Sequence, residues 1–196
     1  MKPFAALFIF GFWVIICKAQ VTTDSVGINL ASIQEDSSLL SKTQIYIDSS
    51  SSLSIPEVLR KEFPPLESFK FRKRLPKGMV TFSYYLKFFV SNSSAKEITV
   101  YVYPGMHFED IKLYKADTQP ANVSNAGHIA GYGKLTLAAG EQCNILIYLK
   151  PLKNEFVFIT PIIINENFVD NYKLFVLGYK TDLQIFGLIL SGVLLM

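Results

Sequence analysis

The chain has 196 residues, and half of them are apolar, which suffices for one domain with a sizeable core. Its 19 Lys and Arg residues against 16 Asp and Glu residues give a net charge of +3. Lys2 and Lys18 contribute two of those cations from the first 19 residues, so the remainder is nearly neutral and gives no indication of a nucleic-acid partner. The 16 Phe and 10 Tyr residues favour strands over helices.

The first 19 residues have the three parts of a secretory signal peptide. Lys2 provides a positive start, residues 4–16 form an uncharged core of 13 residues, and Ala19 supplies the small residue before a cut. An uncleaved anchor would need a longer core, and lipidation at Cys17 would need a small residue directly before it, where an isoleucine stands. We therefore expect residues 1–19 to be removed. Cleavage leaves one cysteine, so the exported part has no intramolecular disulfide.

The next part of the chain is polar before its first regular elements. Residues 20–44 are serine-rich without sustained periodicity, which predicts a leader of low order. Residues 45–47 read as a short edge strand, and the serine tract 48–52 reads as a linker. Ser54 and Glu57 have the spacing of a capping box, which predicts a short helix to about residue 63, where two prolines follow.

A dense run of cations precedes the first long strand. Five cations occupy eight positions: Lys70, Arg72, Lys73, Arg74 and Lys77. A patch for a polyanion or for lipid headgroups is one interpretation. A solvated approach to the strand is favoured, because such runs are usually hydrated surface.

From residue 81 the hydrophobic pattern changes to the period of two that is typical of strands. Turn signals separate the segments, and Pro104-Gly105 breaks one of them. Pro161 predicts that its strand lies at an edge or carries a bulge. Residues 168–179 are ambiguous, with a strand or a connector favoured. The expected strands are 81–90, 98–103, 111–115, 134–137, 143–149 and 156–164. Short strands at this spacing predict an all-β fold over residues 45–180, an antiparallel β-sandwich or jelly roll.

The alternation in residues 81–90 also suggests a binding face. It places Phe82, Tyr84, Leu86 and Phe88 on one side, and Tyr85, Lys87 and Phe89 on the other. The side with Lys87 should meet solvent, because an unpaired buried ammonium is unfavourable. Tyr85 is then the best aromatic candidate for stacking on a ligand, with Tyr101 and Tyr103 as neighbours on the next strand. These tyrosines could also simply cover the sheet, with their hydroxyls in water.

The sequence contains no recognisable catalytic or metal-binding constellation. His107 and His128 are far apart, and His107 with Glu109 and Asp110 fits a turn with surface carboxylates better than a cation site. Residues 127–134 resemble a phosphate loop, but a histidine stands at the first required glycine and a leucine at the magnesium-binding hydroxyl position. We expect no enzymatic activity, no metal and no cofactor. Asn92 and Asn122 lie in glycosylation sequons, which matter only in a eukaryotic secretory pathway.

The sequence ends in an apolar segment. Residues 183–196 are 14 uncharged residues, about 21 Å as a helix, whereas a bilayer core needs about 20 residues. A buried terminal helix and a removable tail are the alternatives; for a lipid-anchor tail, residues 175–179 are too apolar to serve as the polar spacer. We expect the start of a first transmembrane helix.

The order of several segments resembles one family. Residues 81–90 contain Tyr84-Tyr85-Leu86-Lys87, and 110–114, 137–140 and 147–150 follow in sequence. This arrangement is similar to the extracellular sensor domain of bacterial seven-transmembrane receptors with diverse intracellular signalling modules. That family has Tyr-Trp-Leu-Arg in the first motif, so Tyr85 and Lys87 depart from it. The resemblance covers about 45–180 and places the apolar end where the first membrane helix begins.

The resemblance implies a jelly roll like that of carbohydrate-binding modules, which binds a sugar or another small ligand and signals to a cytoplasmic output such as a histidine kinase. The chain is then expected at the cell membrane, with residues 20–180 periplasmic or extracellular. The expected partners are a small-molecule or carbohydrate ligand and the membrane, with a homodimer left open. The alternative is an exported or membrane-anchored carbohydrate-binding or adhesion module without signalling; an exported hydrolase is a third, weaker hypothesis, since no nucleophile–base or paired-carboxylate signature stands out.

Overall fold

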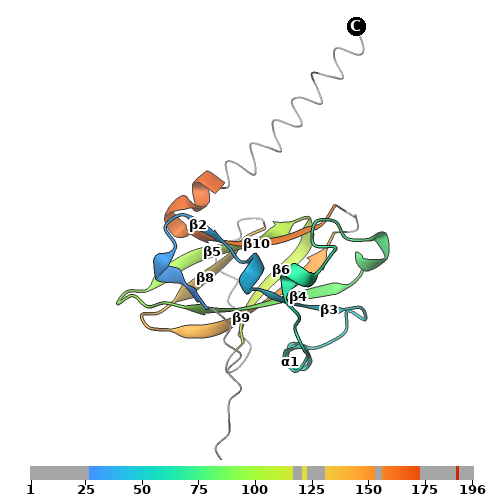
Figure 1. Ribbon diagram of the computed structural model, residues 1–196, viewed down its shortest axis with the longest axis horizontal. Coiled ribbons are helices and arrows are strands. Elements are labelled where there is room, and N and C mark those ends of the chain that lie inside the picture. Colours follow the sequence, from blue (N-terminus) through green and yellow to red (C-terminus); the bar gives the residue numbers. More distant parts are fainter. Residues whose placement is uncertain (1–26, 117–120, 123–130, 153–155, 173–188, 190–196) are drawn as a thin grey trace, which may run out of the picture.

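Two β-sheets pack face to face in the computed structural model, which describes residues 27–116, 121–122, 131–152, 156–172 and 189. A six-stranded sheet has the order β1-β4-β9-β6-β7, with β3 also pairing with β4. A four-stranded sheet has the order β2-β10-β5-β8. The pairs are antiparallel except for β1 with β4. The prediction of an all-β sandwich is therefore confirmed (Figure 1).

Four of the six predicted long strands (98–103, 111–115, 134–137 and 143–149) are longer in the structure, because pairing with neighbours continues past the turn signals, whereas the strands predicted over 81–90 and 156–164 begin two residues later and end one residue later. The described strands are β1 Ile28–Asn29, β2 Asp36–Ser38, β3 Gln44–Asp48, β4 Ser83–Ser91, β5 Ile98–Met106, β6 Phe108–Lys115, β7 Ala121–Asn122, β8 Gly133–Leu137, β9 Gln142–Pro151 and β10 Phe158–Asn165. Helix α1 spans Ile55–Leu59. Single 3-10 turns span Leu30–Ser32, Leu40–Lys42, Leu66–Ser68, Lys77–Met79 and Glu166–Phe168.

The core lies between the two sheets and follows the predicted alternation. On β4, Tyr84, Leu86, Phe88 and Val90 point inward, and none is more than 3% exposed. They pack in one cluster with Val100 and Val102 of β5 and with inward residues of β9. Burial of such apolar side chains stabilises a fold by about 25 cal/mol for each Å² removed from water.

Two glycines allow the sheets and strands to approach closely. A Cβ on Gly133 of β8 would collide with the side chain of Leu113 in the opposite sheet. Gly105 has a φ of +133°, and a Cβ there would collide with the backbone carbonyl of Phe158. The prediction that Pro104-Gly105 ends a strand is wrong: β5 continues to Met106, because glycine accepts this conformation beside β10.

The Pro161 strand carries a bulge and is not at an edge. β10 lies between β2 and β5, and its register with β5 shifts between Ile159 and Ile162. The carbonyl of Pro161 accepts a hydrogen bond from the Leu39 backbone N–H at 2.9 Å. The bulge thus accommodates the missing proline donor, as a central strand requires.

Residues 27–44 belong to the sandwich, which corrects the prediction of a low-order leader over 20–44. β1 pairs with β4 and β2 pairs with β10. Four apolar side chains from this stretch enter the core: Ile28, Leu30, Ile33 and Leu39, each no more than 7% exposed. Their irregular spacing shows neither strand nor helix periodicity, so a pattern search misses them. The β-domain therefore begins before residue 45, whereas residues 20–26 lie outside the described residues.

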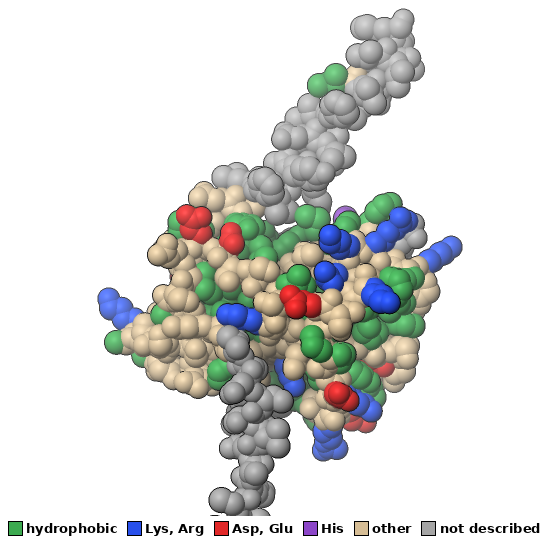
Figure 2. Space-filling model, viewed as in Figure 1, with side chains coloured by type: hydrophobic (Ala, Val, Ile, Leu, Met, Phe, Trp, Pro, Cys, Tyr) green, Lys and Arg blue, Asp and Glu red, His purple; other side chains and the backbone are tan. Residues whose placement is uncertain are grey.

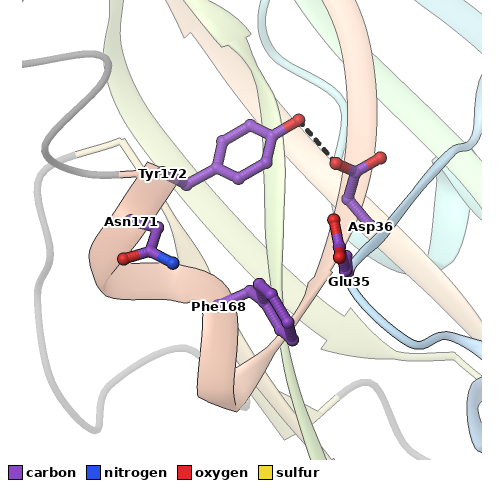
Figure 3. A pocket seen from close by; sticks show the side chains of 5 residues that line it. All are labelled: Glu35, Asp36, Phe168, Asn171 and Tyr172. Carbon is purple, nitrogen blue, oxygen red and sulfur yellow. Dashed lines mark hydrogen bonds between the residues drawn. The ribbon is translucent and has the colours of Figure 1, made fainter.

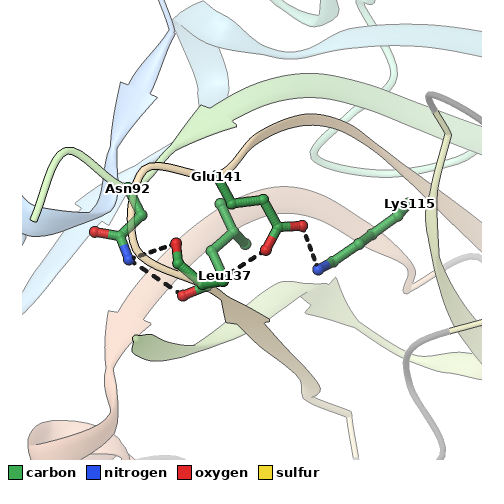
Figure 4. A network of polar contacts seen from close by, with 5 residues as sticks. Asn92, Lys115, Leu137 and Glu141 are labelled. Atoms are coloured by element: carbon green, nitrogen blue, oxygen red, sulfur yellow. Dashed lines mark hydrogen bonds and ion pairs between the residues drawn. The ribbon is translucent and has the colours of Figure 1, made fainter. Parts of the chain in front are cut away.

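Asn92 ties the end of β4 to the other sheet (Figure 4). Its Nδ2 donates to the carbonyls of Lys96, Leu137 and Ala138 at 2.7, 3.1 and 3.0 Å. Glu141 accepts from the Ala138 backbone N–H at 2.7 Å and pairs with Lys115 at 2.6 Å. Asn92 is 1% exposed, so the amide of this sequon is occupied by hydrogen bonds within the fold.

The helices near residues 54 and 168 differ in extent from the prediction. The Ser54 backbone N–H and hydroxyl both donate to Glu57, at 2.8 and 2.6 Å, which bears out the predicted cap; the helix ends at Leu59, earlier than residue 63. The segment 168–179, expected as a strand or connector, follows on from the Glu166–Phe168 turn and is α-helical over 169–172, and its residues 173–179 lie outside the described residues. Among the described residues, no helix is both long enough and apolar enough to cross a membrane. The predicted signal peptide (1–19) and, apart from Ile189, the apolar segment 183–196 lie outside the described residues.

Candidate functional site

The predicted face around Tyr85 is covered by the chain itself. Tyr85 is 3% exposed and packs with Val58 of α1, Phe63 and Leu146. Its ring centroid lies 5.5 Å from that of Tyr148, and its hydroxyl donates to the Leu53 carbonyl at 3.5 Å. Burial raises the pKa of Tyr85 to about 12. The expectation of a solvent-facing Tyr85 is therefore wrong, because residues 53–63 fold back over the outer face of the six-stranded sheet.

Lys87 lies on that same outer face at the margin of the covered cluster. Its Nζ lies 4.6 Å from the centroid of the Phe63 ring, a cation–π contact. Burial lowers the pKa of Lys87. The aliphatic stem thus extends the apolar cover while the ammonium is held by an aromatic ring. Lys87 is a packing residue here rather than an open contact point for a ligand.

The structure does not bring Tyr101 and Tyr103 next to Tyr85. β5 belongs to the four-stranded sheet, so these two tyrosines lie on the opposite outer face of the sandwich. Tyr101 is partly exposed and faces Ile164 across the β5–β10 pair. Tyr103 is 9% exposed and stacks at 4.9 Å, centroid to centroid, on Tyr132. The four predicted site residues therefore divide into two pairs on two faces.

An aromatic cluster covers the outer face of the four-stranded sheet. Its members are Tyr101, Tyr103, Tyr132, Ile162, Ile164, Phe168, Val169 and Tyr172. Burial raises the pKa of Tyr103 to about 12 and also raises that of Tyr132. The buried hydroxyl of Tyr132 has no hydrogen-bond partner among the described residues. Buried hydroxyls are nearly always paired, so this one is an exception among the described residues.

Beside this cluster lies a pocket with a volume of about 390 Å³ (Figure 3). One wall is Glu35 and Asp36, at the start of β2. The opposite wall is Phe168, Asn171 and Tyr172, from the helical segment 166–172 that follows β10. The two aromatic side chains project from this segment toward the two carboxylates. The pocket therefore lies between the N-terminal part of the sandwich and the segment through which the chain leaves it.

The polar groups of the pocket are a pair of carboxylates, a carboxamide and a phenol. The Tyr172 hydroxyl donates to Asp36 Oδ2 at 2.9 Å, and desolvation together with this acidic partner raises the pKa of Tyr172 to about 12. Asn165 fixes the backbone of the acidic wall: its Nδ2 donates to the Ile33 carbonyl at 3.0 Å, and its backbone N–H donates to the Glu35 carbonyl at 2.8 Å. Flat aromatic faces with carboxylate and amide groups at the rim suit a polyhydroxylated or cationic small ligand.

Sequence reasoning missed this pocket completely. Glu35 and Asp36 fall in the stretch predicted as a low-order leader, and Phe168 and Tyr172 fall in the stretch predicted as a strand or connector. The available signal was the set of isolated apolar residues around the acidic pair, Ile33 and Leu39, which anchor that stretch in the core. Tyr172 and Asp36 meet in the pocket but are 136 positions apart in the sequence, so no local pattern indicates their contact.

Among the described residues, no three His, Cys, Asp or Glu side chains gather as metal ligands would. Asp110, near His107, forms an ion pair with Lys112 at 2.7 Å. Residues 127–130 of the phosphate-loop-like stretch, which include His128, lie outside the described residues, whereas Gly133 and Lys134 belong to β8. No protein-family model and no curated protein matches this chain.

Proposed function

We propose that this chain is the extracytoplasmic ligand-sensing domain of a bacterial membrane signalling receptor. Its ligand is a small molecule or carbohydrate bound in the pocket between β2 and the helical segment 166–172. The role is non-catalytic, and the signal passes through the segment after residue 172 toward the apolar residues 183–196. The single observation that supports this function best is that the segment leading to the apolar end forms one wall of the pocket.

A ligand in the pocket would compete with a contact between its two walls. The Tyr172 hydroxyl occupies one oxygen of Asp36, and the remaining carboxylate oxygens of Asp36 and Glu35 can accept bonds from ligand hydroxyl or ammonium groups. Phe168 and Tyr172 offer faces on which a sugar ring or a cation can stack. Binding that rearranges the Tyr172–Asp36 contact changes how residues 166–172 sit on β2. Such a change is a differential interaction of the kind that a conformational signal requires.

The finer fold that we propose is a jelly roll similar to carbohydrate-binding modules. Support comes from the path of the chain: β4, β6 and β9 belong to the six-stranded sheet, whereas β5, β8 and β10 belong to the other. The chain thus crosses repeatedly between the two sheets, as in Greek-key and jelly-roll sandwiches. We propose the cell membrane as the location, with residues 20–180 periplasmic or extracellular.

The test measures binding of the full chain, in detergent, to a panel of glycans and small cations by isothermal titration calorimetry. We expect the Phe168→Ala variant to lose about tenfold in affinity or more, because about 1.4 kcal/mol of stacking corresponds to a factor of ten. Tyr148→Ala, on the covered face, is the matched control and should bind as the parent does. Equal binding by the Phe168→Ala variant, or no binding by the intact chain, would overturn the proposed site.

An adhesion or carbohydrate-binding module without signalling is the second candidate. Hydrogen exchange separates it from the receptor: a sensor ligand should change the amide protection of residues 166–172, whereas a simple binding module should keep it constant outside direct contacts. The coding sequence beyond residue 196 gives an independent answer. Further hydrophobic segments there would favour the receptor, and an immediate stop would favour the anchored module.

A further inference from the structure

A second surface lies at the other end of β10 from the pocket, where that strand begins. We define the basic–apolar patch by its exposed members, which are Lys70, Phe71, Lys73, Arg74, Lys77, Met106, Leu152 and Phe156. The four apolar side chains are 36–57% exposed, and they account for four of the five large hydrophobic side chains found exposed in the described part of the chain. Figure 2 shows Lys and Arg side chains gathered at the upper right, interspersed with hydrophobic ones.

Several contacts place these members together. The Arg74 guanidinium lies 5.7 Å from the centroid of the Phe156 ring. Met106 is paired in register with Phe158, two residues after Phe156. Leu152 donates its backbone N–H to the carbonyl of His107 at 2.8 Å, next to Met106. The cationic loop and three strand ends thus form one continuous surface.

The loop that presents the cations is fixed to the sandwich. Leu75 is fully buried, and the Arg72 carbonyl accepts the Ile159 backbone N–H at 2.7 Å. The Arg72 side chain donates to the Glu67 carbonyl at 2.7 Å. Phe69 packs against the core while Phe71, two positions on, is 45% exposed. The exposure of Phe71 therefore belongs to an anchored loop with a defined orientation.

The lysines of this patch are not neutralised by the part of the chain that the structure describes. Lys70, Lys73 and Lys77 are exposed, and none forms an ion pair with a described residue. The exposed carboxylates in the same stretches are Glu67 and Glu109, whereas Asp110 is paired with Lys112. Positive charge therefore predominates among the described residues at this end.

We infer that the basic–apolar patch docks on the surface of an anionic phospholipid bilayer. Cations attract acidic headgroups, and each Lys or Arg near such a surface contributes about 1 kcal/mol. A soluble polyanion would neutralise the same cations but leave Phe71, Phe156 and their neighbours in water. A bilayer accommodates both the cations and the apolar side chains, because aromatic and aliphatic side chains insert at the boundary between headgroups and acyl chains. The inference is independent of the proposed ligand pocket.

The placement of the patch fits this partner. Figure 1 shows the loop region that follows α1 on the upper side of the sandwich, at the right, and the helical segment 166–172 (orange) on the same side at the left. These are the two ends of β10. A bilayer along this side would contact the patch and lie next to the segment through which the chain leaves the domain.

The test uses a local probe, so that membrane binding by the apolar end does not affect the result. The full chain carries Trp13→Phe and Phe71→Trp, which leaves one tryptophan, in the patch. It is mixed with vesicles of phosphatidylcholine alone or with added phosphatidylglycerol. We expect a blue shift of the emission from this introduced tryptophan and quenching by bromolipid with the anionic vesicles only, weakened by raised salt.

Charge variants then show which cations are responsible. The triple variant Lys70→Gln, Lys73→Gln, Lys77→Gln should partition onto anionic vesicles about ten- to a hundredfold more weakly, as measured by the same tryptophan probe. The matched control, Lys42→Gln, Lys61→Gln, Lys96→Gln, removes the same charge from exposed lysines elsewhere and should behave as the parent does. Far-ultraviolet circular dichroism checks that all variants keep the fold. An unshifted tryptophan signal, equal loss in both triple variants, or dextran sulfate binding without lipid quenching would each overturn the inference.

Discussion

The two outer faces of the sandwich carry similar tyrosine-rich strands but are covered differently by other segments of the chain. On the six-stranded sheet, α1 and the residues after it lie over Tyr85 and Leu146, and both are 3% exposed or less. On the four-stranded sheet, the helical segment 166–172 packs in one cluster with Tyr103 and Tyr132, and its own Phe168 and Tyr172 line a pocket against Glu35 and Asp36. An outward aromatic side chain is therefore a packing residue where another segment of the chain covers it. Where no segment covers it, it is a candidate ligand contact.

The hydrogen bonding of the buried tyrosine hydroxyls also differs between the two faces. On the covered face, the Tyr85 hydroxyl reaches a backbone carbonyl, whereas on the open face the buried Tyr132 hydroxyl finds no partner among the described residues. A closed packing layer pairs its polar atoms, because an unpaired buried group is unfavourable by about 1–3 kcal/mol. The Tyr132 hydroxyl on the outer face of the four-stranded sheet is thus the exception to this rule among the described residues.

The largest effect should come from alkaline pH, which acts on both faces at once. The pKa values of Tyr85, Tyr103 and Tyr172 are raised to about 12 in the fold, against about 10 in an unfolded chain. The folded state then holds protons that the unfolded state releases, so this stabilisation is complete below pH 10 and is lost as pH rises toward 12. Urea unfolding at successive pH values, with tyrosinate absorbance, measures it. Flat stability between pH 10 and 12 would contradict the burial of these tyrosines.

A smaller effect should distinguish the faces by packing. Leu146→Ala creates a cavity under α1 and should lower the free energy of unfolding by about 2–5 kcal/mol. Ile162→Ala, on the open face and partly exposed, is the matched change and should have less than half that effect. Urea denaturation of both variants gives the comparison. Equal losses would show that the helical segment 166–172 closes its face as completely as α1 does.

The smallest effect on stability is expected at Tyr132. Tyr132→Phe removes a buried hydroxyl that has no partner among the described residues, so the free energy of unfolding should stay within about 0.5 kcal/mol or rise. Tyr85→Phe serves as the control on the covered face, where a hydrogen bond is lost. Thermal unfolding of the two variants measures this difference in stability. A clear loss of stability in the Tyr132→Phe variant would mean that its hydroxyl is already satisfied.

The sequence by itself determined the class of fold and the inward side of its strands. The alternation over β4 correctly assigned Tyr84, Leu86 and Phe88 to the core, because a strand turns successive side chains to opposite faces and only one face can fill the interior. The capping residues Ser54 and Glu57 likewise determined where α1 begins, since the cap involves only neighbours in sequence.

Only the tertiary structure decided what covers the outward sides. Whether Tyr85 meets water depends on α1 folding back over a sheet, and whether Tyr101 neighbours Tyr85 depends on which sheet β5 joins. The pocket depends on contact between Asp36 and Tyr172, from opposite ends of the domain. Local periodicity describes one strand at a time, whereas these outcomes are set by the pairing of distant segments, which buries apolar residues such as Leu30 and Leu39 whatever their local pattern.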